Sequence, residues 1–318
     1  MTTTQTIKNE LLSNLTTLQP CCKVAFLSAV FRSAGSLLIN SDGFGVSVSG
    51  ENLELMQLVS RTVEEMFGVI CPVKTSYNPI KNNDIYSVLV KDVTVLRETS
   101  ILAKKDGFTG IVGDIDPYLF ADECCVKNFL IGLFVGCGTV TFPLNNDGQK
   151  ITGYHIEFFV SSPVVANSLI DLLKQKGLHF KTAPRADGTV VYAKDSATIS
   201  DFLAYLGANK AVLELQTLLI ERECINNANR QSNCITANIG KSVNASEKQI
   251  ADIEYVIKHK GWEYFSENLK TIAKIRMENP SANLTELATM CGDQLTKSGV
   301  AHRLRKIALL AKKLGKKD

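Results

Sequence analysis

The C-terminal end of the chain concentrates the side chains best suited to bind a polyanion. Residues 294–318 contain eight lysines and arginines and one acid, which gives +7, whereas the other 293 residues carry −4. Ammonium and guanidinium groups neutralise phosphates, and this neutralisation supplies much of the affinity of a protein for a duplex. The asymmetry favours double-stranded DNA as the partner. Charge alone leaves a solubilising tail as the alternative.

The spacing of apolar residues predicts that this basic segment is helical from near Thr296 or Ser298. At about 100° per residue, Ser298, His302 and Arg305 point away from the apolar face, flanked by Ala301 and Lys306. The predicted apolar face consists of Val300, Leu304, Ile307, Ala311 and Leu314. The outer face of its first half is therefore polar and basic.

A shorter helix is predicted immediately before it. Asn283 and Glu286 have the types and spacing of an N-cap and N3 pair, and Gly292 is placed to end the helix. Two helices joined by a short turn, the second with a basic outer face, form the pattern of a DNA-binding helix-turn-helix.

Individual roles follow from the reach of each side chain into a groove. We assign Arg305 to guanine edges in the major groove, and His302 and Ser298 to shorter-range contacts. We assign Lys297, Lys312 and Lys313 to phosphates. Arg303 lies nearer the buried edge of the helix. The predicted DNA-binding residues are Lys297, Ser298, Ala301, His302, Arg303, Arg305, Lys306, Lys312 and Lys313.

Cysteine is the other residue type that could do chemistry, with nine copies in the chain. Two pairs are adjacent in sequence, at 21–22 and 124–125, but no C-x-x-C spacing occurs and no histidine lies near either pair. Free cysteine packs as a small apolar residue, so we predict reduced, buried thiols and neither a metal nor a cofactor. The alternative is that the adjacent pairs bind a soft metal or form a redox site.

An internal repeat indicates how the rest of the chain is built. Residues 21–37 align without gaps on residues 124–140. The identities are Cys21/Cys124, Cys22/Cys125, Phe26/Phe129, Leu27/Leu130, Phe31/Phe134 and Gly35/Gly138. Period-2 and period-3.6 patterns after each copy predict the order α-β-β-α-β-β-α twice. We therefore expect a pseudo-twofold α+β domain.

This arrangement resembles the LAGLIDADG homing-endonuclease fold, through LSAVFRSAG at 27–35 and LIGLFVGCG at 130–138. The resemblance implies that two signature helices pair through small residues. In active members, the last acid of each signature holds a divalent metal, and Ala34 and Cys137 stand at those positions here. Neither supplies the carboxylate that a hard cation needs, so we predict the fold without catalytic residues and without enzyme activity.

The stretch between the two parts is rich in Asn and Ser and poor in large apolar residues. We expect a linker at 223–245, with helical signals resuming at Ser246, which could form a capping box with Gln249. The predicted domains are 1–222, containing repeats at about 19–100 and 122–208, and 246–318.

The chain as a whole resembles the WhiA family through CCKVAFLSAVFRSAGS, NRQSNCITANIGKSV and LTKSGVAHRLRKI, over roughly residues 5–315. The resemblance implies a degenerate LAGLIDADG domain joined to a helix-turn-helix similar to region 4 of sigma factors. It also implies a role in transcription, cell division and chromosome segregation in Gram-positive bacteria, with sporulation in some relatives. RNA polymerase or a sigma factor would be the protein partner.

Composition and hydropathy are consistent with a folded chain outside the membrane. Apolar residues make up 45% and charged residues 21%, and no apolar run reaches the roughly 20 residues of a bilayer span. The first residues lack the features of a secretory signal. We expect a cytoplasmic, nucleoid-associated regulator. The competing functions are a metal-dependent LAGLIDADG nuclease and a protein-binding adaptor.

Overall fold

The structure, a computed structural model, describes residues 2–15, 18–41, 43–80, 82–105, 108–142, 153–292 and 295–316. It divides into two compact units, Met1–Leu219 and Ile220–Asp318. Each unit has its own hydrophobic core and is described by itself. The polar, glycine-containing stretch NNDGQ at 145–149, which predicts a turn between two strands, lies outside the described residues.

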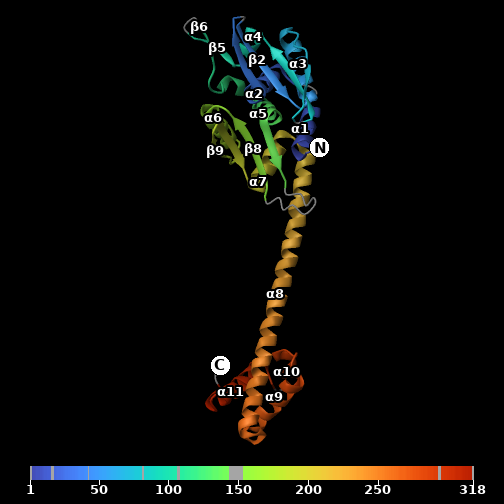
Figure 1. Ribbon diagram of the computed structural model, residues 1–318, viewed down its shortest axis with the longest axis vertical. Helices are drawn as coiled ribbons and strands as arrows, with labels where there is room; N and C mark the ends of the chain where they lie inside the picture. Colours follow the sequence, from blue (N-terminus) through green and yellow to red (C-terminus); the bar gives the residue numbers. More distant parts are fainter. Residues whose placement is uncertain are drawn as a thin grey trace. The chain divides into compact units, whose positions relative to one another are not determined.

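The N-terminal unit contains the predicted repeat (Figure 1). The first copy consists of α2 (Pro20–Ala34), β1 (Gly35–Asn40), β2 (Gly43–Gly50), α3 (Leu53–Phe67), β3 (Lys74–Asn78), β4 (Asn83–Val90) and α4 (Val93–Glu98). The second consists of α5 (Glu123–Cys137), β7 (Gly138–Thr141), β8 (His155–Val160), α6 (Pro163–Gln175), β9 (Lys181–Arg185), β10 (Gly188–Ala193) and α7 (Ser196–Leu206). The two sheets have the equivalent orders β1-β2-β4-β3 and β7-β8-β10-β9, so the predicted α-β-β-α-β-β-α pattern is confirmed.

The signature helices α2 and α5 pack directly against each other because small residues line their contact. A Cβ on Gly132 would lie 2.6 Å from the Phe26 carbonyl oxygen, and one on Gly136 would lie 2.0 Å from Ser33 Oγ. Neither distance is possible for a side chain. Glycine at these two positions therefore lets the helices approach closely, in agreement with the pairing through small residues that the resemblance implied.

Four elements in the described part of this unit were not predicted. Helix α1 (Thr3–Ser13) buries Ile7 and Leu11, which are spaced i, i+4 and were the available signal. The hairpin β5 (Leu102–Lys105) and β6 (Phe108–Ile111) and the 3-10 helix η1 (Pro117–Phe120) connect the two copies.

A single helix, α8 (Asn209–Lys260), contains the predicted linker. The Glu10 carboxylate accepts the backbone N–H groups of Lys210 at 2.7 Å and Ala211 at 3.2 Å, which stabilises the start of α8. Residues 220–245 are all exposed and helical, so a break at this linker was a wrong expectation. The Asn and Ser residues of this stretch can still be helical, because each costs less than about 1 kcal/mol relative to Ala. Extending a helix that has already formed is also favourable.

The capping box expected at Ser246 is also wrong, because the helix passes through this residue without a start. The Ser246 hydroxyl donates instead to the Pro280 carbonyl at 2.5 Å. Nearby, the buried Arg276 guanidinium donates to the Ala282 carbonyl at 2.7 Å. These bonds fix residues 280–282 to α8 through Ser246 and to the helix that contains Arg276.

The C-terminal unit is built from the end of α8 and short helices. These are η2 (Trp262–Tyr264), α9 (Glu267–Glu278), α10 (Leu284–Met290) and α11 (Lys297–Lys313). Ile253 and Val256 of α8 pack with Ile272 of α9 in the core. Among the described residues, no helix combines the length and hydropathy needed to span a bilayer.

Candidate nucleic-acid interface

The start of α10 has the hydrogen bonds that its sequence predicts. The Asn283 side chain accepts the N–H groups of Thr285 at 2.9 Å and Glu286 at 3.1 Å. The Glu286 carboxylate in turn accepts the Asn283 N–H at 2.8 Å, so the capping box is confirmed. The Thr296 hydroxyl caps α11 by accepting the Gly299 N–H at 3.2 Å. Both helices therefore begin where the motif requires.

The rotation of α11 about its axis is set by its buried face. Val300, Leu304 and Ile307 are at most 4% exposed and pack with Leu287 of α10. Turning the helix would expose these side chains, and each buried aliphatic side chain contributes roughly 1.5–3 kcal/mol. The face opposite them is thereby held toward solvent.

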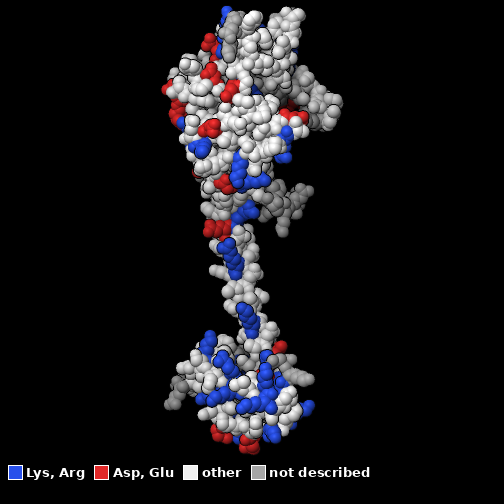
Figure 2. Space-filling model, turned by 90° about the vertical axis from the view of Figure 1, so that its left-hand side faces the viewer, with Lys and Arg blue, Asp and Glu red and all other residues white. Residues whose placement is uncertain are grey.

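The predicted DNA-binding residues lie mostly on that solvent face. Ala301 and Arg303 are half-buried. The exposed members are Lys297, Ser298, His302, Arg305, Lys306, Lys312 and Lys313. Figure 2 shows lysines and arginines gathered over one face of the C-terminal unit, while acids gather at its far end.

Arg303 occupies the edge expected for it, beside the end of α10. Burial raises the pKa of the Cys291 thiol, and the positive charge of Arg303 partly opposes this rise. Arg303 is half-buried, between the buried and the exposed faces of α11. The position agrees with the prediction, and the DNA-contacting role of Arg303 stays a prediction.

A shallow groove of about 370 Å³ runs between α11 and the end of α8. Arg305 and Lys312 line it together with Lys248 of α8 and with Lys316. Lys316 donates to the Asp252 carboxylate at 2.7 Å. Lys248 was not predicted from the sequence, because it lies 49 residues or more from the basic helix and joins it only through packing.

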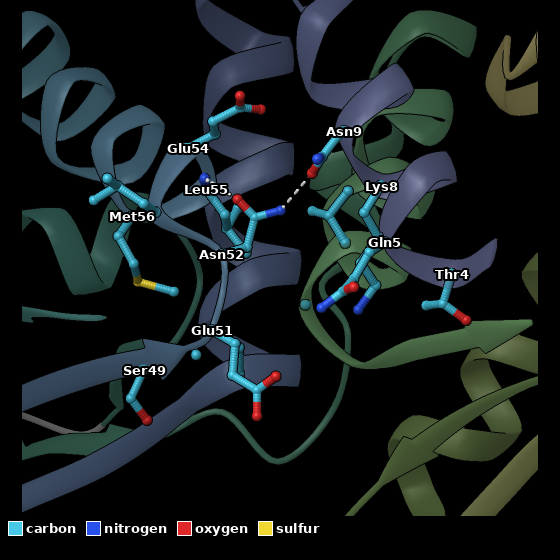
Figure 3. A pocket seen from close by; sticks show the side chains of 15 residues that line it. Thr4, Gln5, Lys8, Asn9, Ser49, Glu51, Asn52, Glu54, Leu55 and Met56 are labelled. Atoms are coloured by element: carbon cyan, nitrogen blue, oxygen red, sulfur yellow. Dashed lines mark hydrogen bonds between the residues drawn. The ribbon is translucent and has the colours of Figure 1, made fainter. Parts of the chain in front are cut away.

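The ends of the signature helices form the second candidate site. Ala34 and the end of α5 line a pocket of about 580 Å³, and neither Ala34 nor Cys137 carries a carboxylate. Figure 3 shows Gln5 and Lys8 of α1 on one side of this pocket and Glu51 on the other.

Lys8 lies in the same pocket, next to the positions at which active members of this fold carry metal-binding acids. Burial lowers the pKa of Lys8, and the neighbouring Cys137 and Glu51 oppose that shift. Burial raises the pKa of Cys137 to about 12, so its thiol is neutral at pH 7. A lysine next to a neutral thiol and an alanine disfavours binding of a divalent cation.

The structure also brings the two cysteine pairs together at the other ends of the signature helices. The sulfurs of Cys21, Cys22, Cys124 and Cys125 all lie within 4.8 Å of one another. Each pair taken separately in the sequence gave no indication of this cluster. The signal was present in the repeat alignment, since a twofold axis through paired helices places equivalent residues close together.

Comparison with protein families accounts for both units. A model described as the WhiA N-terminal LAGLIDADG-like domain matches residues 20–102, and the WhiA LAGLIDADG-like domain matches residues 126–224. The WhiA C-terminal HTH domain matches residues 228–311. Together these models follow the two repeats and the helical unit.

Relatives match over nearly the whole chain. A probable cell division protein WhiA of Alkaliphilus oremlandii is 35% identical over 301 residues, and that of Clostridium acetobutylicum is 33% identical over 299 residues, each covering 92% of both chains. The crystal structure of full-length WhiA from Thermatoga maritima aligns with a TM-score of 0.59 at 22% identity, covering 100% of both chains. The chain therefore belongs to the WhiA family, with a degenerate LAGLIDADG domain and a C-terminal helix-turn-helix.

Proposed function

We propose that this protein is a sequence-specific double-stranded DNA-binding regulator whose helix α11 reads the major groove. The observation that carries the proposal is the division of α11 into a buried apolar face and an exposed polar one. Ser298, His302 and Arg305 are exposed near its start, while Val300 and Leu304 anchor it. In helix-turn-helix proteins, the first half of the second helix contacts base edges.

Base reading and phosphate contact fall to different residues in this proposal. Arg305 can donate two hydrogen bonds to the O6 and N7 of guanine, which is a sequence-specific contact. Lys312 and Lys313, two turns further on, neutralise phosphates together with Lys297 at the start of the helix. Lys248 extends this phosphate-binding surface from α8, because it shares a groove with Arg305 and Lys312.

The N-terminal unit contributes no phosphodiester hydrolysis in this proposal. Its signature helices end in Ala34 and Cys137, and the half-buried Lys8 lies near Cys137. Hydrolysis by this fold requires carboxylates that hold a divalent metal beside the scissile phosphate.

The biological role we propose is regulation of genes for cell division and chromosome segregation, exerted on the nucleoid. It draws on the relatives, which are named probable cell division proteins. RNA polymerase or a sigma factor as protein partner stays a prediction from the family resemblance.

Mapping of bound sites across the genome, followed by binding measurements with the full chain, tests the proposal. We expect a shared sequence motif, and a duplex carrying it should bind at least about 10³-fold more tightly than a scrambled duplex. Equal affinity for both duplexes would contradict sequence-specific binding. Loss of all duplex affinity would favour the adaptor function.

A further inference from the structure

We infer that Cys21, Cys22, Cys124 and Cys125 form a zinc site that joins the first turns of the two signature helices. The four sulfurs lie within 4.8 Å of one another, the one such group of potential metal ligands in the described part of the chain. Each helix supplies an adjacent pair, and the pseudo-twofold relation brings the two pairs together. We call these four residues the cysteine cluster.

The geometry of the cysteine cluster is close to that of tetrahedral zinc. A Zn–S bond of about 2.3 Å places the sulfurs of a site with four thiolate ligands about 3.8 Å apart. Contraction by about 1 Å or less is therefore enough to reach it from the present arrangement. Iron–sulfur clusters distribute four cysteines over two or four iron atoms and hold the sulfurs on different irons further apart, so a single ion fits better.

Contacts across the helix pair show that the thiols already face a common centre. The sulfurs of Cys21 and Cys22 on α2 lie within 4.8 Å of those of Cys124 and Cys125 on α5. Cys22 and Cys125 are each 2% exposed, whereas Cys21 and Cys124 are exposed. The buried pair would hold the ion from within, and the exposed pair leaves a path for its entry from solvent.

The electrostatics of the helix ends favour an anionic centre at this place. Neither Gln19, the N-cap of α2, nor Asp122, the N-cap of α5, makes a side-chain capping hydrogen bond. Two uncapped N-termini therefore present their positive ends to the cysteine cluster. A zinc ion with four thiolates has a net charge of −2, which the two helix dipoles stabilise.

Proton balance distinguishes the metal-free and zinc-bound states. A cysteine thiol carries a proton, whereas zinc binds the thiolate. Zinc binding forms four Zn–S bonds and releases four protons to solvent, with no change of oxidation state. A disulfide would need an oxidant, which a reducing compartment does not supply.

Metal analysis of the full chain tests the site. The chain, purified under reducing conditions without a histidine tag, should contain one zinc ion by elemental analysis and by native mass spectrometry. Metal-free chain should take up one Co²⁺ and show the thiolate charge-transfer and intense visible bands of tetrahedral cobalt. Metal-free chain with reduced thiols that takes up neither ion would overturn the inference. So would a native mass lower by two hydrogens for each of two disulfides.

A matched pair of double variants locates the ligands. Cys21→Ser with Cys124→Ser removes the two exposed thiols and should reduce zinc content to roughly a tenth or less. Cys224→Ser with Cys234→Ser also removes two exposed thiols, both from α8, and should leave zinc content unchanged. Circular dichroism of each variant reports whether it folds. The cobalt spectrum of the unmodified chain tests the site even if the first variant does not fold. Equal zinc content in the two variants would contradict the inference.

Discussion

The two units of this protein differ in whether buried packing residues or exposed polar residues bear on their proposed function. In the N-terminal unit, close packing of α2 on α5 is retained through Gly132 and Gly136, while the helix ends that could catalyse carry Ala34 and Cys137. In the C-terminal unit, a small core orients α11, and the polar residues on its exposed face are accessible for the DNA contacts that we propose. The close packing of the scaffold is thus present without carboxylates at the two helix ends, whereas the recognition that we propose depends on a few exposed side chains.

The largest expected difference between the units is between DNA binding, which we expect to occur, and DNA cleavage, which we expect to be absent. The full chain should bind duplex DNA and leave supercoiled plasmid uncut in Mg²⁺ or Mn²⁺, because neither signature helix ends in a carboxylate. Agarose gels of plasmid incubated with the purified chain report nicking. Nicking that follows the chain through purification and stops with chelator would show that the N-terminal unit is a nuclease.

Affinity for DNA should also depend on one unit more than the other. Replacing Arg305, Lys306 and Lys312 together by Ala should weaken duplex binding by roughly 100-fold or more. A matched triple variant of the N-terminal unit takes exposed cations from edge strands β3 and β9. It replaces Lys74, Lys181 and Arg185 by Ala and should change affinity by less than about 2-fold, since surface cations away from the interface act only at long range. Fluorescence anisotropy measures both. Similar losses would show that the two sheets also bind DNA.

Sequence preference should depend on a single residue of α11. Arg305→Ala should cost about 1–3 kcal/mol on a specific duplex and much less on a scrambled one, because a bidentate contact to guanine is lost. Competition binding with the two duplexes measures the difference. An equal loss on both would reduce Arg305 to a phosphate contact.

Close packing in the N-terminal unit should be sensitive to one methyl group. Gly132→Ala places a Cβ 2.6 Å from the Phe26 carbonyl and should destabilise this unit by about 1–3 kcal/mol. Hydrogen exchange should accelerate in peptides from α2 and α5 and stay unchanged in those from α10 and α11. Gly240→Ala is the control, because its Cβ meets nothing within 4 Å and should stabilise α8 by up to about 1 kcal/mol. Unchanged exchange in α2 and α5 would contradict the packing argument.

The smallest expected effect separates phosphate contact from base reading. Lys312→Ala should weaken binding to specific and scrambled duplexes alike and reduce the slope of log K against log salt by about one. Binding isotherms over a salt series measure this slope. A slope equal to that of the unmodified chain would place Lys312 outside the phosphate contacts.

The sequence by itself determined most local structure. Apolar spacing predicted the helices of both repeats, and Asn283 with Glu286 predicted the start of α10, because capping depends on groups three residues apart. The buried face of α11 at Val300, Leu304 and Ile307 followed from the 3.6-residue period in the same way.

The tertiary structure alone decided what depends on distant groups. Whether the polar stretch around 223–245 continues as helix depends on helical residues packed in a core at each end, which local propensity does not encode. Lys248 joins the basic groove, and Lys8 meets Cys137, only because separate helices pack together. The cysteine cluster shows the same limit: each pair has no metal-binding pattern in sequence, and a four-sulfur site exists only once α2 and α5 lie side by side.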